Sequence, residues 1–121
     1  MGSATTKALE ASTKALASVT ASVDLGTASE LFAAGRAIGG SRQLAAVLAD
    51  PAVDAAAKST LVGSAFGTSV SATTLGLLTT VAAQRWSGPD DLLAGIEELG
   101  LRAASLASLR SGADVEGELF Q

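Results

Sequence analysis

A continuous apolar helical pattern over residues 71–86 most constrains how this chain can fold. The stripe that repeats at about 100° per residue comprises Leu75, Leu78, Ala82 and Trp86. Ser71 can cap this helix, Ser87-Gly88-Pro89 can end it, and Leu77 and Val81 widen the stripe to about half of the circumference. A helix at the rim of a small domain buries a narrower stripe than this one. We therefore expect the flank formed by Leu77 and Val81 to meet either another internal helix or a partner.

The composition favours closely packed helices in one small domain. Hydrophobic residues make up 48% of the 121 residues, mostly alanine, leucine and valine, whereas aromatic residues make up only 3%. Such a core must be built from helices that approach closely through small side chains, and these residues favour helix over strand. The sequence therefore predicts an all-α fold.

The charge and the residue inventory argue against several classes of function. A net charge of −4 and scattered basic residues predict no nucleic-acid binding. No apolar run of about 18 residues is present, so we expect no membrane insertion, and the absence of a secretory leader pattern predicts a soluble, cytoplasmic protein. The chain has no His, Cys or Tyr, and its adjacent Asp90 and Asp91 diverge on a helix, so we expect no enzyme, metal or other cofactor.

Residues 4–23 predict the first helix, with two surfaces that matter for binding. Leu9, Leu16, Val19 and Val23 share an apolar stripe. A strip of small residues beside it consists of Ala4, Ala8, Ala11 and Ala15. This strip allows the backbone of another helix to come close, whether that helix belongs to the same domain or to a partner.

Helix caps and stops divide the rest of the chain into further helices. Asp24-Leu25-Gly26 is typical of a turn, and Thr27 with Glu30 matches a capping box that begins the second helix. The later helices are predicted to begin at Ser41, Asp54, Ser71 and Pro89. The pattern indicates six helices, with Leu92, Ile96, Leu99, Ala103 and Leu106 forming the buried face of the last one.

The end of the chain differs in character from the rest. Residues 109–121 are acidic, and Glu118-Leu119-Phe120 repeats the triplet Glu30-Leu31-Phe32. We therefore predict a helical domain over residues 1–108 and an acidic tail over 109–121 that begins a further region absent here.

Four motifs, in order and spacing, resemble the delta subunit of bacterial ATP synthase, a relative of the mitochondrial oligomycin-sensitivity-conferring protein. They are Lys14-Ala15-Leu16, then Leu48-Ala49-Asp50-Pro51-Ala52-Val53 followed by Lys58 and Leu61-Val62, then Phe66, and finally residues 75–85. The similarity is to the N-terminal domain of that family and covers residues 4–106. The family's aromatic residue before the first motif is absent, and Ser12 stands in its place.

The resemblance implies a six-helix bundle that sits on the catalytic head as part of the stator, at the cytoplasmic face of the bacterial plasma membrane. In this family the domain holds the N-terminal helix of an alpha subunit between its first and fifth helices. Carried over to this chain, the partner-binding residues are Ala8, Ala11, Ala15, Leu77, Leu78 and Val81. The family's C-terminal part, which joins the b subunits, is missing here. The implied role in proton-driven ATP synthesis is mechanical and non-catalytic.

The residues alone leave one alternative open: a helical adaptor that binds an amphipathic helix of an unrelated partner. The two interpretations share the same surface and differ only in the partner. On either one, Val81→Glu is expected to leave the fold helical and abolish peptide binding, because an unpaired carboxylate would enter an apolar contact.

Overall fold

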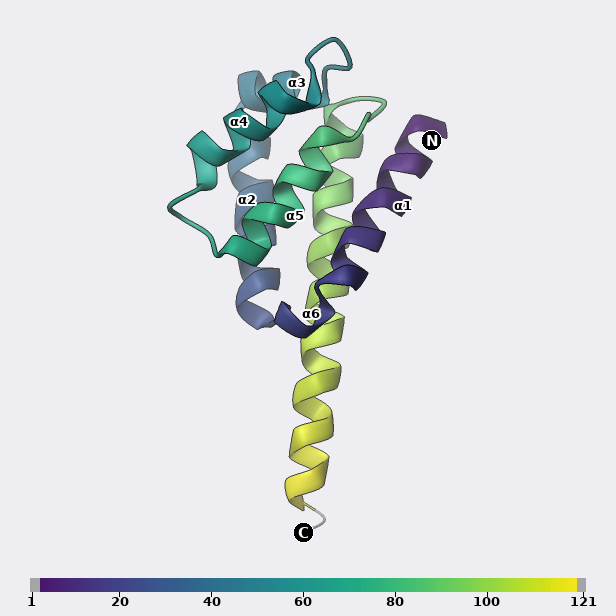
Figure 1. Cartoon of the computed structure of the whole chain (residues 1–121), viewed down its shortest axis with the longest axis vertical. Helices are drawn as coiled ribbons and strands as arrows, with labels where there is room; N and C mark the ends of the chain where they lie inside the picture. The colour runs from purple at the N-terminus through teal and green to yellow at the C-terminus, as the bar shows by residue number, and fades with distance from the viewer. Residues whose placement is uncertain (1–2, 120–121) are drawn as a thin grey trace.

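Six α-helices make up the computed structural model, which describes the backbone of residues 3–119 and the side chains of residues 6–109 (Figure 1). The helices are α1 Ser3–Ser18, α2 Leu25–Gly39, α3 Arg42–Ala49, α4 Ala55–Phe66, α5 Ala72–Ala83 and α6 Pro89–Leu119. A short 3-10 helix, Thr20–Ser22, joins α1 to α2. Residues 3–119 contain no strand. The prediction of an all-α, six-helix bundle in a single small domain is confirmed for this part of the chain.

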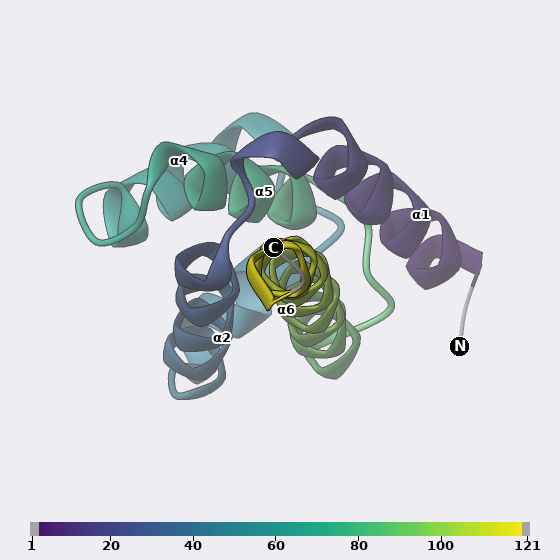
Figure 2. The same ribbon diagram turned by 90° about the horizontal axis from the view of Figure 1, so that it is seen from below.

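Helix α6 lies in the middle of the bundle. Figure 2 shows α4, α5 and α1 in a row on one side of α6, with α2 beside α6 below that row. Helix α5 contacts α1, α2, α3, α4 and α6, while α1 contacts both α5 and α6. Helix α5 therefore has neighbours on both flanks and beneath it, which leaves only its outer face to solvent.

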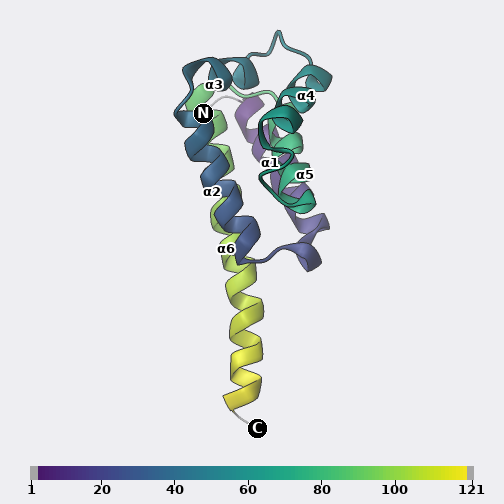
Figure 3. The same cartoon turned by 90° about the vertical axis from the view of Figure 1, so that its left-hand side faces the viewer.

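The buried face of α6 follows the predicted pattern. Leu92, Ile96, Leu99 and Ala103 are at most 1% exposed, and Leu106 is half-buried. Beyond the bundle, α6 projects as a single helix (Figures 1 and 3). It runs past residue 108 to Leu119, so the helix is not interrupted at the proposed division between 1–108 and 109–121.

Helix starts are set by caps that the sequence predicts. The backbone N–H of Leu44 donates to Ser41 Oγ at 3.2 Å, and that of Ala57 donates to Asp54 Oδ1 at 2.8 Å. Ser71 caps α5 in the same way, and α6 begins at Pro89 with Asp90 and Asp91 in its first turn, where carboxylates favour the helix dipole.

Two predicted boundaries near the start of the chain are wrong. Helix α1 ends at Ser18 instead of residue 23, because the hydroxyls of Ser18 and Thr20 donate to the carbonyls of Ala15 and Ala17 and favour a tighter turn. Helix α2 begins at Leu25, since Asp24 forms the capping box with Thr27 at 2.9 Å.

The predicted end of the fifth helix at residue 86 is also wrong. Helix α5 ends at Ala83 and Gln84 is extended, so Trp86 lies in the following loop. Trp86 is nevertheless only 3% exposed, because it folds back and its Nε1–H donates to the carbonyl of Val81 at 2.8 Å. The same carbonyl also accepts from the backbone N–H of Gln84 at 3.2 Å, so both bonds fall at the C-terminal end of α5, where helix carbonyls lack partners further along the helix.

Candidate functional site

The residues predicted to bind a partner do not form one exposed surface. Leu77, Leu78 and Val81 are 1–3% exposed and Ala8 is 1% exposed, all four within the domain's own core. The expectation that these four residues present an unfilled groove is therefore wrong. The broad apolar face of α5 is used internally, since the helix packs against neighbours on both flanks.

Helix α1 turns a narrow face inward. Ala8, Ser12 and Leu16 are buried, whereas Ala11 and Ala15 are half-buried beside them. The buried hydroxyl of Ser12 donates to the carbonyl of Ala8 at 2.7 Å, which satisfies it within the helix. Of the predicted binding residues, only Ala11 and Ala15 thus keep a surface that another molecule can touch.

The orientation of α5 identifies the side chains that lie next to α1. Leu78 and Ala82 share a small cavity with residues of α3 and α4, namely Leu48, Val62 and Phe66. The flank of Leu77 therefore faces α1, and the helical repeat places Thr73, Gly76 and Thr80 next to it toward solvent. Together with Ala11 and Ala15 they form a surface of small residues, which we call the α1–α5 seam.

The seam is supported by buried core residues, and one of its hydroxyl groups is bonded within α5. Thr80 donates from Oγ1 to the carbonyl of Gly76 at 2.9 Å. The buried Leu77 and Val81 lie beneath it and fix the position of α5 against the core. Sequence reasoning missed the α5 residues of the seam because it followed the apolar stripe rather than the small polar residues at its edge.

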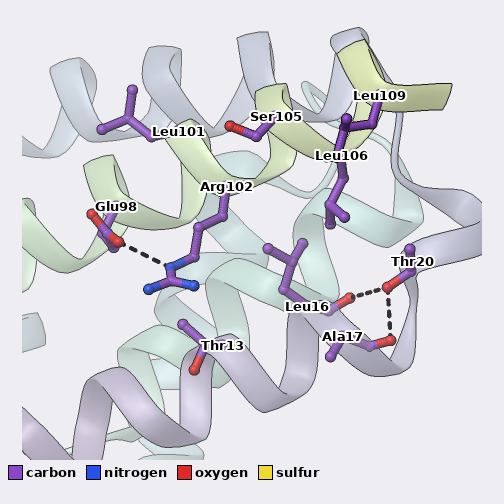
Figure 4. Close-up of a pocket in the computed structure, with 10 residues that line it drawn as sticks. All are labelled: Thr13, Leu16, Ala17, Thr20, Glu98, Leu101, Arg102, Ser105, Leu106 and Leu109. Atoms are coloured by element: carbon purple, nitrogen blue, oxygen red, sulfur yellow. Dashed lines mark hydrogen bonds and ion pairs between the residues drawn. The ribbon is translucent and has the colours of Figure 1, made fainter. Parts of the chain in front are cut away.

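A second surface, between α1 and α6, is hollowed and was not predicted. Two adjoining hollows of about 620 and 470 Å³ share Thr13, Glu98 and Arg102. The α1 side is lined by Thr6, Leu9, Glu10, Thr13, Leu16, Ala17 and Thr20. The α6 side is lined by Asp91, Ala94, Gly95, Glu98, Leu101, Arg102, Ser105, Leu106 and Leu109. We call this surface the α1–α6 groove, and Figure 4 shows the larger of its two hollows.

The groove combines apolar walls with charged groups at its middle. Arg102 Nε donates to Glu98 Oε1 at 2.9 Å across one turn of α6 (Figure 4). Leu101 and Leu109 are 53% and 71% exposed and stand at the outer edge. Periodicity assigned Leu9 and Leu106 to the core, but both are only half-buried in the structure, so no sequence signal indicated this groove.

Lys58, one of the motif residues, is buried. Its side chain is 2% exposed in the first half of α4. Burial lowers the pKa of the Lys58 ammonium, the Asp50 carboxylate opposes that shift, and the Arg85 charge adds to it. Lys58 thus lies close enough to the α3–α4 loop and to the end of α5 for their charges to affect it.

The described residues hold no cluster of three or more His, Cys, Asp or Glu side chains that could bind a metal ion. None of the helices within residues 3–119 has the length and apolarity to span a bilayer. The features that stand out for function are therefore two helix-lined surfaces, one on each side of α1.

The chain is similar to proteins named ATP synthase subunit delta, although no protein-family model matches it. It is 48% identical to the one from Leifsonia xyli subsp. xyli over 120 residues, which are 99% of this chain and 45% of that protein. Identity is 39% to the one from Salinispora arenicola, over 78% of this chain and 35% of that protein. Identity is 34% to the one from Corynebacterium glutamicum, over 92% of this chain and 46% of that protein. The chain spans less than half the length of these relatives.

Proposed function

We infer that the chain belongs to the family of ATP synthase delta subunits, and we propose on that premise that it is a non-catalytic module of the ATP synthase stator. The observation that carries the proposal is 48% identity to a protein of that name over 99% of the chain. The resemblance inferred from the sequence motifs points the same way. The proposed task is to hold the catalytic head still while the central shaft turns.

The helical bundle is suited to a mechanical task. Its core side chains Leu31, Leu48 and Leu92 are fully buried and come from three different helices. A load applied to one helix is therefore shared by the whole core, since packed interiors transmit strain. A stator contact must also dissociate slowly, and burying apolar surface at about 25 cal/mol/Å² provides that, less the cost of ordering the partner.

We further propose that the N-terminal helix of an alpha subunit binds along the α1–α5 seam. The small side chains of Ala11, Ala15 and Gly76 permit a short distance between helix axes, which depends on the residues at the contact. This retains two of the α1 residues proposed from sequence and replaces the α5 residues Leu77, Leu78 and Val81 by Thr73, Gly76 and Thr80.

The remaining features follow from the resemblance and are part of the same proposal. The whole protein would sit peripherally at the cytoplasmic face of the membrane. Its C-terminal part would join the b subunits, and residues 109–121 would lead toward that part. The α6 helix continues without a break through residue 109, which is compatible with a rigid connection in that direction.

Titration calorimetry with a peptide of an alpha-subunit N-terminus tests this proposal. Ala11→Glu places a carboxylate in the seam, and Ala17→Glu places the same group on the opposite side of α1, in the α1–α6 groove. We expect Ala11→Glu to abolish measurable binding and Ala17→Glu to leave it unchanged, with equal helicity in both variants by circular dichroism.

Three outcomes would count against the proposal. No binding by the unaltered chain would remove the alpha-subunit helix as its partner. Loss of binding only in Ala17→Glu would move the site away from the seam. Recovery of a protein unrelated to ATP synthase in a pull-down, without alpha subunits, would favour the helical adaptor.

A further inference from the structure

The α1–α6 groove is long enough to hold one helix. Its α1 wall runs from Thr6 to Ala17, about 17 Å, and continues at Thr20 in the following 3-10 helix, while its α6 wall runs from Asp91 to Leu109, about 27 Å, at a rise of about 1.5 Å per residue. The two hollows adjoin each other along α1 and α6, because both are lined by Thr13, Glu98 and Arg102. A helix of three to five turns, about 11 to 18 residues, matches the length of these walls.

The walls of the groove are apolar along most of this length. Leu9 and Leu16 on α1 face Ala94 and Leu106 on α6. Leu109 is 71% exposed at the lower end, which leaves an apolar contact open to solvent. The occupant must therefore bring an apolar stripe of its own.

The charges that line the groove are mostly negative. Glu10 on α1 and Asp91 and Glu98 on α6 are carboxylates, and Arg102 is the one cation among the lining residues, already paired with Glu98 at 2.9 Å. The α1–α5 side of the same helix differs, since the exposed Lys7 and Lys14 lie toward it on the helical repeat. The groove side of α1 is therefore the more acidic of the two, and it favours a basic partner.

We propose that the α1–α6 groove docks a basic amphipathic helix from another protein, with its apolar stripe on Leu9, Leu16 and Leu106 and its lysines or arginines toward Glu10, Asp91 and Glu98. A second copy of this chain is a poor occupant, because its net charge is −4 and it would bring further carboxylates to an acidic rim. This proposal does not depend on the role of the α1–α5 seam.

A fluorescein-labelled peptide of about 18 residues, with leucine and alanine on one helical face and lysine on both flanks, is the probe. Anisotropy is measured against the full 121-residue chain, and a peptide with glutamate in place of every lysine is the control. We expect saturable binding of the lysine peptide and at least about tenfold weaker binding of the glutamate peptide.

Matched variants locate the binding site. Glu10→Lys reverses a charge inside the groove, and Glu97→Lys makes the same change on α6 beside Phe32 and Arg36, outside it. We expect about tenfold weaker binding for Glu10→Lys and no change for Glu97→Lys. Leu109→Ser should weaken binding, while Leu25→Ser, which alters a leucine exposed elsewhere, should not.

Each opposite result overturns the proposal. Absence of saturable binding, equal binding of the two peptides, or equal effects of Glu10→Lys and Glu97→Lys would each exclude a charge-matched helix in the groove. Self-association in sedimentation equilibrium that Leu109→Ser removes would show that a second copy covers the groove. Loss of alpha-subunit peptide binding in Ala11→Glu leaves this proposal unaffected, so the two proposals fail separately.

Discussion

Thr74 on α5 donates a hydrogen bond of 2.6 Å from its Oγ1 to Glu30 Oε1 on α2, across 44 residues of sequence. The same carboxylate accepts from the backbone N–H of Ser71 at 3.1 Å and from its hydroxyl at 3.0 Å. Glu30 lies on α2 and thus caps the N-terminus of α5, where a negative charge is favourable. These donors hold the pKa of the Glu30 carboxyl below its ordinary value, led by the bond from Thr74.

Removing this carboxylate should weaken the contact between α2 and α5. We expect Glu30→Ala to lower the free energy of unfolding by about 1–2 kcal/mol at neutral pH, because charge-assisted bonds to a helix start are lost. Glu97→Ala, an exposed glutamate on α6, is the control and should change it by less than about 0.5 kcal/mol. Urea unfolding followed by circular dichroism measures both.

Acid should remove the same stabilisation. Since the folded-state pKa of Glu30 lies below its unfolded value, its contribution is present above the unfolded pKa and is lost as the pH falls through the folded pKa. The difference in unfolding free energy between the unaltered chain and Glu30→Gln should therefore shrink between neutral pH and about pH 3. A constant difference across that interval would mean that the charge of Glu30 contributes nothing.

Gly95 and the indole of Trp86 occupy adjoining space. A Cβ placed on Gly95 would lie 2.7 Å from Cζ3 of Trp86, so the ring must move and weaken its hydrogen bond to Val81. We expect Gly95→Ala to destabilise the fold by about 1–3 kcal/mol and to red-shift the fluorescence of Trp86, the single tryptophan. A Cβ added at Gly76, on the exposed face of α5, meets no atom within 4 Å. Gly76→Ala should therefore stabilise the fold by about 0.5–1 kcal/mol without changing the fluorescence of Trp86.

Local sequence signals predicted the helices well because they act over a few residues. The caps at Ser41, Asp54 and Ser71 lie where expected, since each needs only a side-chain oxygen and a nearby N–H. Glu30 was assigned to its own helix, and no local pattern could show that its partners lie on α5. Its position depends on tertiary packing.

The candidate site was harder to predict for a related reason. Periodicity shows that Leu77 and Val81 are apolar, and it cannot show how many neighbours surround α5. Both residues are sealed in the core, whereas Ala11 and Ala15 are half-buried. The α1–α6 groove forms where the axes of α1 and α6 diverge. The sequence of either helix alone does not determine the angle between them.

Val81 and Thr80 are adjacent in sequence, and replacing each by glutamate should affect different properties, the stability of the fold at Val81 and partner binding at Thr80. Val81 is 1% exposed, so Val81→Glu is now expected to destabilise the fold by about 3–5 kcal/mol by burying an unpaired charge. Thr80 is half-buried in the α1–α5 seam, so Thr80→Glu should stay folded and lose affinity for the alpha-subunit peptide. Thermal unfolding and calorimetry on both variants test this, and a stable Val81→Glu domain would contradict the packing of α5.

Salt should affect binding at the two surfaces of α1 differently. Binding along the α1–α5 seam is expected to rest on apolar contact, so its affinity should change by less than about twofold between 50 and roughly 500 mM salt. Binding of the lysine peptide in the α1–α6 groove depends on Glu10, Asp91 and Glu98, and should weaken by about tenfold or more over the same interval. Because screening acts on exposed charges and barely on apolar burial, equal salt sensitivity of the two peptides would mean that they share one site.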